Sequence, residues 1–528
     1  MQQTFFLIPH QLGPLPMFGF GWALIVWIAA CALLLAYLAW KQGFNGDTLS
    51  YLPVMLVFAA ALVYVAPMME IADDGRTLGL PIRGYGVMML IGVVSAVGLA
   101  AYRAQRMGIQ SELIFSMAFV MFLAGIVGAR LFFIIEYRDQ YLREPMQIFN
   151  VTQGGLVVYG SVLGGLPAGV IFLMRRGYSF RKVLAVGDII APSMLIGLAF
   201  GRIGCLMNGC CFGGVCEQDW APQMTFPRRA AYALQDSPPY AHQRELGQLH
   251  GLRLASDAEG RAIVAHVYDD ASEEVRASLT TGVVIEAIQL TPRDAVRLAD
   301  RVPLMIGSRI QVEKADGEVV EVPVLESPSE EGGQVGFALR PIRRGWIVSN
   351  LTLGGPADMT GKLTSGDEVR GVTLPPLARI ADGFQPPLKA ADVAEVLLHS
   401  AGPSFTVVTD YGSRVNVALD KLPDYSRPVH PTQIYSAING FLLCFFLWVL
   451  YPFRRHDGDV FAVMLVVYPI ARFLLELIRN DEPAQFGTAL TIAQLVSVAI
   501  FLTGAAMLIY LARQPQGSVL PESEATSA

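Results

Sequence analysis

Nine apolar runs constrain this chain most, because each is long enough to cross a lipid bilayer. A membrane-spanning helix needs about 20 mostly apolar residues. The runs cover residues 18–40, 51–69, 84–102, 113–135, 155–174, 183–201, 433–451, 459–478 and 488–511. Only 16% of the 528 residues are charged, whereas about 25% is usual for a soluble domain. The sequence therefore predicts an all-α polytopic membrane protein with about nine transmembrane helices.

The positive charges of the short loops predict the orientation of the chain. The richer set of loops holds Lys41, Arg103, Arg106, Arg175, Arg176, Arg181, Lys182, Arg454, Arg455 and Arg513, and the poorer set holds Arg76, Arg83, Arg138, Arg143 and Arg479. Loops rich in Lys and Arg favour the cytoplasm. We therefore expect the N-terminus and residues 215–430 outside and the C-terminus inside. The N-terminus lacks the basic region and cleavage site of a signal peptide, so no cleaved signal peptide is expected.

Residues 216–426 differ from the apolar runs, because they are charged and punctuated by Gly and Pro. They predict an inserted soluble α+β region outside the membrane. A seven-residue pattern at 279–285 recurs at 363–369, and a hairpin turn follows each copy, at 315–317 and at 410–412. Helical stretches are expected between pattern and hairpin, at 292–301 and 388–400. The repeat predicts two units, at about 245–325 and 333–422.

The second of these units resembles a PDZ domain. It contains Gly-Phe-Ala-Leu at 336–339, a predicted strand at 346–350, Gly-Pro-Ala at 355–357 and Gly-Asp at 366–367. PDZ domains bind a peptide as an added strand and hold its terminal carboxylate on backbone N–H groups. The resemblance therefore implies capture of an extracytoplasmic peptide. The simpler alternative, which the sequence alone favours, is a folded spacer that shapes the entrance to the membrane part.

The segment 201–214, Gly-Arg-Ile-Gly-Cys-Leu-Met-Asn-Gly-Cys-Cys-Phe-Gly-Gly, directly follows an apolar run. It places Arg202 and Asn208 at the end of a predicted membrane helix. Ionisable groups at such positions are costly and are functional candidates by default. A guanidinium suits a phosphate, because its planar fork can donate two hydrogen bonds at once. A phospholipid is the phosphate-bearing molecule that a membrane site would meet.

Other polar residues interrupt the apolar runs. Arg130 follows a run of small residues, and Tyr159 stands in a glycine-rich stretch. Arg472, Glu476 and Arg479 recur at i, i+4 and i+7, which places them on one face of a helix. A buried ion pair between Arg472 and Glu476 is the structural alternative. For the glycines the alternative is close helix packing.

Four of the six cysteines gather in one short segment; they are Cys205, Cys210, Cys211 and Cys216. Structural zinc sites favour pairs of cysteines separated by two to four residues, and adjacent cysteines do not fit that spacing. A disulfide, reduced packing thiols and a cysteine nucleophile all remain open. Cys31 and Cys444 lie in apolar runs and are predicted to be packing residues. We expect no metal and no other cofactor.

The polar motifs of the apolar part resemble those of the prolipoprotein diacylglyceryl transferase family. The family signature, Gly-Arg-x-Gly-Asn-Phe-x-Asn-Gly-Glu-x-x-Gly, is matched at Gly201, Arg202, Gly204, Asn208, Gly209 and Gly213. Other pieces follow in the family's order: Arg-Gly-Tyr-Gly-Val-Met at 83–88, Gly-Ala-Arg-Leu at 128–131, Asp-Ile-Ile-Ala-Pro at 188–192, His-Pro-Thr-Gln-Ile-Tyr at 430–435, and Tyr468, Arg472, Glu476, Arg479 and Asp481. The resemblance covers about 80–215 and 427–512.

The resemblance implies a reaction in a bacterial inner membrane. The diacylglyceryl group of phosphatidylglycerol moves to the thiol of a lipobox cysteine in a preprolipoprotein, and glycerol phosphate leaves. Arg202 and Arg472 would bind the phosphate, with Glu476 orienting Arg472, while Asn208 and Tyr85 would bind the headgroup or shape the pocket. The further candidates for substrate binding are Arg130, Tyr468, Arg479, His430 and Gln433. A nucleic-acid partner is not expected, and a monomer is the default.

The chain departs from the family pattern at three positions. Tyr159 stands where the family has a histidine, and Cys205 and Cys210 stand where the signature has Asn and Glu. A tyrosine titrates near pH 10 and is a poorer base than a histidine. Tyr159 remains the catalytic candidate there, and a non-catalytic phospholipid-binding or transport paralogue remains the alternative. An intramembrane metalloprotease is disfavoured, because no histidine stands in a His-Glu-x-x-His motif.

The sequence thus predicts five parts. Two extra N-terminal transmembrane helices occupy 1–79, and the transferase core occupies 80–215 and 427–512. The PDZ-like insert occupies 216–426. A cytoplasmic tail, 513–528, is predicted to be disordered, because it is rich in Pro, Gly, Ser and Glu.

Overall fold

The computed structural model divides the chain into two units. The first holds residues 1–223, 230–234 and 429–528, and the second holds 224–229 and 235–428. The described residues are 3–43, 52–73, 76–136, 158–218, 220–231, 236–289, 309–323, 337–342, 345–351, 357–373, 404–418, 422–479 and 490–519.

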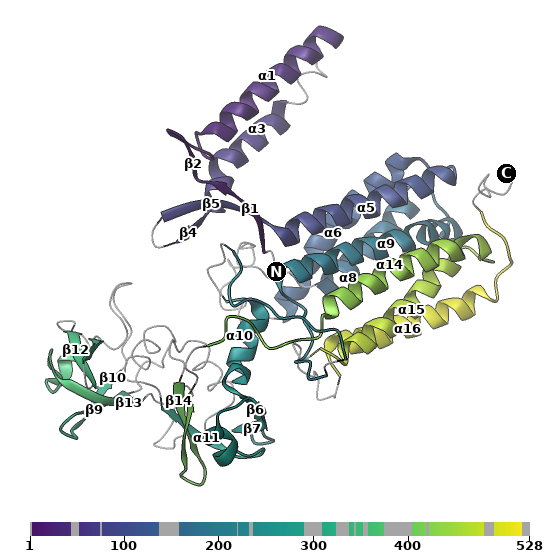
Figure 1. Cartoon of the computed structure of the whole chain (residues 1–528). Helices are drawn as coiled ribbons and strands as arrows, with labels where there is room; N and C mark the ends of the chain where they lie inside the picture. The colour runs from purple at the N-terminus through teal and green to yellow at the C-terminus, as the bar shows by residue number, and fades with distance from the viewer. Residues whose placement is uncertain are drawn as a thin grey trace. The chain divides into compact units, whose positions relative to one another are not determined.

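The first unit is mainly helical (Figure 1). Its helices are α1 (Trp22–Gln42), α3 (Leu52–Ala60), α4 (Ala66–Met68), α5 (Gly84–Arg106), α6 (Ser111–Glu136), α8 (Val158–Arg175), α9 (Phe180–Asn208), α14 (Thr432–Leu450), α15 (Asp459–Glu476) and α16 (Ile492–Leu511). A π-helical segment, Ala61–Val65, joins α3 to α4. Three strands, β1 (Thr4–Pro9), β4 (Ile71–Asp73) and β5 (Arg76–Arg83), form an antiparallel sheet in the order β1-β5-β4, beside a small hairpin of β2 (Gln11–Leu12) and β3 (Leu15–Pro16).

Six helices within the described ranges are long and apolar enough to cross a membrane. They are Trp22–Lys41, Gly84–Arg106, Ser111–Ile135, Phe180–Asn208, Thr432–Phe453 and Ile492–Leu511. This confirms a polytopic membrane protein. The other three predicted spans correspond to the shorter apolar helices Leu52–Met68 and Gly160–Arg175 and to α15, which carries Asp459, Arg472 and Glu476. The count of nine spans stays a prediction.

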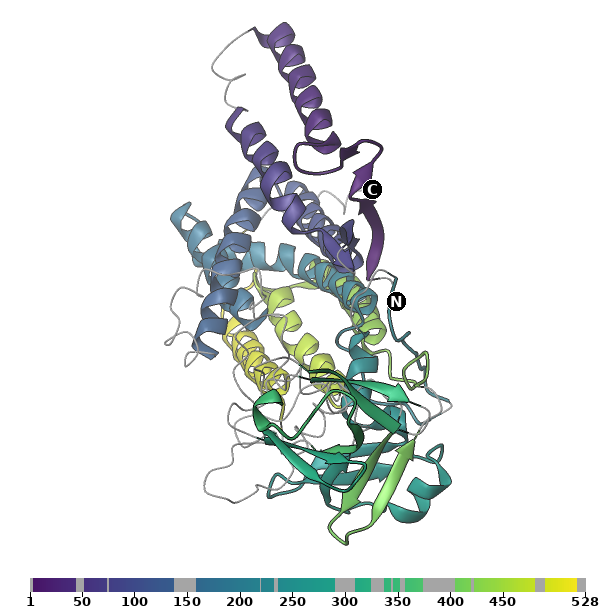
Figure 2. The ribbon, with the colours of Figure 1, turned by 90° about the vertical axis from the view of Figure 1, so that its left-hand side faces the viewer.

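Helix α9 is central to the membrane unit, between α5 and α14 (Figures 1 and 2). It also contacts α15, which packs against α16, while α6 packs mainly against α8. A common apolar core draws buried side chains from α5, α6, α8, α9, α14 and α15. In a membrane no hydrophobic effect drives helices together, and they associate through close packing at small residues. A Cβ atom on Gly128 would lie 2.4 Å from the Gly160 carbonyl oxygen, so glycine is required where α6 crosses α8.

A buried carboxylate fixes the start of α15 against α9. Asp188, on α9, is fully buried. Its Oδ2 accepts a hydrogen bond from the Gly458 N–H at 2.7 Å, and its Oδ1 accepts one from the Phe461 N–H at 2.8 Å. The first N–H groups of a helix have no partner inside the helix. Asp188 therefore caps α15 from a neighbouring helix.

The described residues of the second unit form short helices and three sheets. Its elements are α10 (Pro238–Glu245), β6 (Leu252–Ser256), β7 (Ala262–Val267), α11 (Glu273–Ser278), β8 (Ile285–Gln289), β9 (Arg309–Lys314), β10 (Val319–Pro323), β11 (Phe337–Ile342), β12 (Gly345–Leu351), β13 (Glu368–Thr373), β14 (Ser404–Thr409) and β15 (Arg414–Ala418). One sheet has the order β10-β9-β13-β12-β11, another has the order β15-β14-β8, and β6 pairs with β7. An α+β insert is thus present.

Each of the two predicted repeat units contributes its last two strands to the core of the other unit. Strands β9 and β10, from the first predicted unit, complete the five-stranded sheet of the second. Strands β14 and β15, from the second, pack with 252–289 around one apolar core. The module of 309–373 is therefore nested in sequence within the module of 252–289 and 404–418. The predicted helical stretches at 292–301 and 388–400 lie outside the described residues.

The module formed by 252–289 and 404–418 should lose stability in mild acid because of the adjoining His250. This side chain is 2% exposed, and its ring lies edge-on to Phe405 at 4.9 Å. Burial lowers the pKa of His250 from 6.5 to about 4. Between these values only the unfolded chain binds the proton, so stability falls as pH falls from about 6.5 to about 4. From pH 7 to pH 5 the loss should be about 2 kcal/mol.

Hydrogen exchange of β6, β7, β14 and β15 in the full chain, corrected for intrinsic rates, would measure this loss. In His250→Gln the part of the pH dependence that comes from His250 should vanish. His266→Gln, at an exposed position on β7, should retain it. An equal loss of protection in wild type and His250→Gln would contradict the assignment.

Candidate active site

Helix α9 ends where the sequence changes from apolar residues to glycines. Gly209 adopts a left-handed conformation (φ 79°), and the Cys210 N–H bonds back to the Cys205 carbonyl at 3.1 Å. This is a common way to end a helix, because a glycine has no Cβ penalty in that region. The chain after Asn208 therefore leaves the helix as a loop, 209–214. Gln3 donates a hydrogen bond to the Asn208 carbonyl at 3.0 Å.

The start of α14 holds this loop in place. Thr432 Oγ1 donates to the Cys211 carbonyl at 2.7 Å, and Gln433 Nε2 donates to the Cys210 carbonyl at 2.8 Å. The Gly213 N–H donates to the His430 carbonyl at 3.0 Å. A Cβ atom on Gly213 would lie 2.7 Å from the His430 Cβ. The motif at 430–435 thus positions the loop 209–214 through two side chains and one carbonyl, all of which bond to the backbone of the loop.

Glu476 is the anionic centre of the site. Its side chain is 1% exposed and forms ion pairs with Arg472 and with Arg479, the latter at 3.4 Å. Thr491 Oγ1 donates to Glu476 Oε1 at 3.0 Å. Thr491 also caps α16 in a capping box with Gln494. The predicted ion pair between Arg472 and Glu476 is therefore present, and it belongs to a larger network.

Sequence reasoning missed Thr491. Its only local signal is a Thr-x-x-Gln pattern before an apolar run, which predicts a helix start. That signal carries no information about a second contact with Glu476, fifteen residues earlier in the chain. Helix capping and orientation of the carboxylate are thus combined in one hydroxyl.

Arg202 lies near this network on the last turns of α9. Its guanidinium interacts electrostatically with Tyr468, Arg479, Cys205 and Cys211. The ion pairs of the described residues give Arg202 no acidic partner. Positive charge is therefore in excess around Arg202, and an anion brought to this point would be stabilised.

Tyr85 lies beside the same turn of α9. Its ring is 3.1 Å from the position a Cβ atom would take on Gly204. Its hydroxyl interacts electrostatically with Arg202 and with the nearby cysteine thiols. Residues from α5, α9 and α15 are therefore brought together around Arg202.

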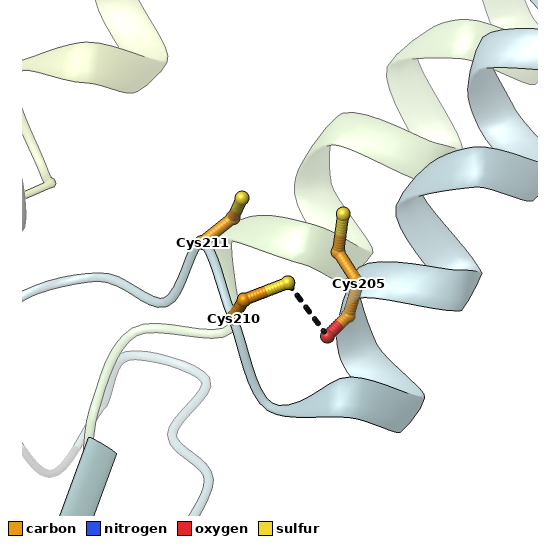
Figure 3. A group of neighbouring side chains, drawn as sticks. All are labelled: Cys205, Cys210 and Cys211. Atoms are coloured by element: carbon orange, nitrogen blue, oxygen red, sulfur yellow. Dashed lines mark hydrogen bonds between the residues drawn. The ribbon is translucent and has the colours of Figure 1, made fainter. Parts of the chain in front are cut away.

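Three cysteine side chains converge in the site (Figure 3). The Sγ atoms of Cys205, Cys210 and Cys211 all lie within 4.8 Å of one another. The Cys210 thiol donates to the Cys205 carbonyl at 3.8 Å (Figure 3). All six cysteines of the chain are free thiols. Cys216 is buried, bonds to the Gln218 carbonyl at 3.6 Å and is not a member of this group.

Some predicted residues lie apart from this cluster or outside the described side chains. Arg130 is buried on α6, with the ring of Phe133 at 5.7 Å from its guanidinium. The backbone of Tyr159 belongs to α8, but its side chain lies outside the described part. His430 contributes its backbone to the loop contacts. The roles of these three side chains stay predictions.

Comparisons with known proteins identify the family to which this sequence is similar. A family model described as prolipoprotein diacylglyceryl transferase matches residues 76–266 and 385–510. A phosphatidylglycerol–prolipoprotein diacylglyceryl transferase of Rhodopirellula baltica is 30% identical over 514 residues, which are 95% of this chain and 87% of that protein. Proteins of the same name from Clostridium tetani and Bacillus mycoides are 35% and 37% identical over 26% and 24% of this chain, or 53% and 46% of their own lengths. The match to the Rhodopirellula baltica protein extends over both units.

Two glycines of the segment 201–214, Gly201 in α9 and Gly213 in the loop, should respond differently to the same substitution. Gly213→Ala would place a Cβ atom within 2.8 Å of two His430 atoms, and such overpacking costs about 1–3 kcal/mol. Gly201→Ala meets only Met89 Sδ, at an ordinary 3.7 Å. The melting temperature of the detergent-solubilised protein should fall by several degrees for Gly213→Ala and stay within about a degree for Gly201→Ala. Equal melting temperatures would contradict the packing described for 209–214.

Proposed function

From the premise that this chain belongs to the prolipoprotein diacylglyceryl transferase family, we propose how its residues carry out the reaction. The protein transfers the diacylglyceryl group of phosphatidylglycerol to the lipobox cysteine thiol of preprolipoproteins, the first step of bacterial lipoprotein maturation. A thioether forms, and glycerol phosphate leaves. The leaving phosphate gains negative charge as its bond to the glyceryl carbon breaks, so the site must stabilise that charge.

The excess of guanidinium groups around Glu476 is the observation that supports this proposal most. Arg472 and Arg479 share Glu476, while Arg202 has no acidic partner among the described residues. Fixed donors in a water-poor site stabilise developing charge most, because they need no rearrangement during the reaction. We assign Arg202 and Arg472 to the phosphate, and Glu476 to positioning Arg472. Arg479 adds positive charge on the same helix face.

The glycerol headgroup needs hydrogen-bond partners beside the phosphate. Gln433 is 1% exposed, and its Oε1 has no hydrogen-bond partner within the described ranges. A buried acceptor without a partner is costly, and a headgroup hydroxyl would satisfy it. Tyr85 lies beside Gly204 on α9, and Asn208 is the last residue of that helix; we assign both to the proposed binding surface. Tyr468 contributes from the α15 side, near Arg202.

The incoming thiol must lose its proton, because the thiolate is the nucleophile. Tyr159 occupies the position of the family's histidine and is our candidate for assisting this step. His430 and Arg130 are further candidates for substrate binding. The replacement of histidine by tyrosine makes proton removal the least conventional part of the mechanism.

For the insert, we propose a PDZ-like role in binding an extracytoplasmic peptide segment. The five-stranded sheet and the turn at Asp367 support the likeness: the Asp367 carboxylate accepts hydrogen bonds from the Thr364 N–H and hydroxyl at 2.8 and 2.9 Å. A preprolipoprotein is a fitting partner, because its lipobox lies at the outer surface. A spacer without peptide affinity remains the alternative.

The membrane arrangement that we propose has nine spans in a bacterial inner membrane. The N-terminus and residues 215–430 lie outside, and the C-terminus lies inside. The five-part division at 79, 215, 426 and 512 and a monomeric state belong to the same proposal. The positive-inside distribution of Lys and Arg supports the orientation. In the proposed orientation, the lipobox and the loop 209–214 lie on the same side.

Loss of either phosphate-binding arginine should stop the reaction without unfolding the protein. Purified protein would be mixed with phosphatidylglycerol and a lipobox peptide, and glycerol phosphate release and the mass gain of the peptide would be followed together. Arg202→Ala and Arg472→Ala should each lower kcat/KM about 10²–10³-fold, as for other fixed donors to a developing anion. Arg106→Ala, an exposed position at the end of α5, is the matched control and should retain full activity.

Two outcomes would overturn this proposal. If folded Arg202→Ala retains wild-type kcat/KM, the phosphate assignment is wrong. If folded wild-type protein binds phosphatidylglycerol but releases no glycerol phosphate with peptide present, the non-catalytic alternative is correct.

A further inference from the structure

The three converging thiols have no role in the mechanism above. Cys205, Cys210 and Cys211 come from the last turn of α9 and the loop after it, and their Sγ atoms lie within 4.8 Å of one another (Figure 3). They stand among the phosphate-binding candidates, since Cys205 and Cys211 interact electrostatically with Arg202. A cluster of three thiols at the point where a fourth thiol must react calls for a chemical explanation.

The backbone explains how two adjacent cysteines can share one site. Cys211 has φ 58°, and it is the only residue other than glycine with positive φ in the described part of the chain. Such a conformation costs about 1–3 kcal/mol and is found at functional sites. It places the Cys211 side chain on the same side as those of Cys210 and Cys205 (Figure 3). Cys210 and Cys211 are adjacent in the sequence, which disfavours a metal site, but in the structure their sulfur atoms lie close together.

The geometry suits a tetrahedral zinc ion. With Zn–S bonds of about 2.3 Å, ligand sulfurs lie about 3.8 Å apart, within reach of the present spacing. Three protein ligands with an open fourth position are the pattern of catalytic rather than structural zinc sites. Cys216 bonds to Gln218 instead, and the group contains no fourth His, Cys, Asp or Glu among the described residues. The fourth position would therefore be available to a substrate.

The surrounding charge also suits this ion. Three thiolates and one Zn²⁺ carry a net charge of −1, and Arg202 and Arg479 both act electrostatically on Cys211. Opposite charges at close range stabilise the ionised thiols. Thr432 and Gln433 hold the carbonyls of Cys211 and Cys210 at 2.7 and 2.8 Å, so the ligand loop is fixed before any ion binds. Such support of ligands by neighbouring groups is a regular feature of metal sites.

We propose that Cys205, Cys210 and Cys211 bind a zinc ion whose open position takes the lipobox thiol and activates it as a thiolate. This inference rests on the proposed function, because it assigns a group to its proton-removal step. A coordinating thiol is deprotonated by its metal, so no strong general base is needed. That would compensate for Tyr159 in place of histidine.

The step balances in atoms and charge. The lipobox thiol binds the ion and releases its proton to water. The thiolate electron pair then forms a bond to the glyceryl carbon, while the bond between that carbon and the phosphate oxygen breaks and its electrons go to the oxygen. Arg202 and Arg472 stabilise the resulting phosphate. The product is a neutral thioether, which is a weaker zinc ligand than a thiolate and can leave.

Metal binding can be measured without any turnover. Full-length protein purified under reducing conditions should contain about one zinc per chain. Replacement by Co²⁺ should give a sulfur-to-cobalt charge-transfer band, and the lipobox peptide should alter that spectrum. Cys205→Ser, Cys210→Ser and Cys211→Ser should each lose the zinc and the band. Cys216→Ser and Cys31→Ser, which lie outside the group, should retain both.

The pH dependence of the rate tests activation of the thiol. With zinc bound, kcat/KM should change little between about pH 6 and pH 8. After removal of the metal by a chelator, kcat/KM should fall about tenfold per pH unit below the thiol pKa of about 8.5, and added zinc should reverse this. The chelated wild-type protein carries no substitution, so this test does not depend on whether the serine variants fold.

The outcomes separate this inference from the proposed function. Full turnover by metal-free protein with an unchanged pH profile would overturn the zinc site and leave the transferase intact. A disulfide within the group in the active protein would also overturn it. Absence of turnover from zinc-loaded and metal-free protein alike would overturn the proposed function, on which the activation step rests.

Discussion

The membrane unit depends on one constraint: a carboxylate buried among apolar helices must have partners. Asp188 meets it with two backbone N–H groups at the start of α15. Glu476 meets it with two arginines and a hydroxyl near the other end of α15. The same helix is thus held at both ends, which fixes the position of Arg472 relative to Arg202. The site is ordered by charge compensation as much as by apolar packing.

Much of the membrane part could be predicted from the sequence, because its signals are local. Apolar runs gave the helices, and the spacing of Arg472, Glu476 and Arg479 gave one face of α15. The contacts of Asp188 and Thr491 could not be predicted, because each joins residues far apart in the chain and depends on how helices cross. The left-handed conformation of Cys211 was also beyond prediction, since nothing in its residue type favours positive φ.

In the insert, the sequence predicted both hairpins correctly, but it did not predict which sheet each hairpin joins. The hairpins that turn at 315–317 and 410–412 have similar patterns, so either could complete either sheet. Burial decides between such alternatives: Ile310 and Val312 enter one core, and Val407 and Val415 enter the other. A repeat therefore identifies interchangeable pieces but does not say which partner each piece takes.

The two chain segments that border residues 216–428 lie side by side. Val215 pairs with Val429 as an antiparallel bridge, and the His430 N–H bonds to the Gly214 carbonyl at 3.1 Å. The ends of any segment placed between them are therefore already joined, and the entropic cost of closing a longer loop grows only slowly with its length. A whole domain can therefore be inserted at this position at little cost to the membrane unit. The segment inserted there could differ among relatives while the loop 209–214 and the arginines around Glu476 keep their positions.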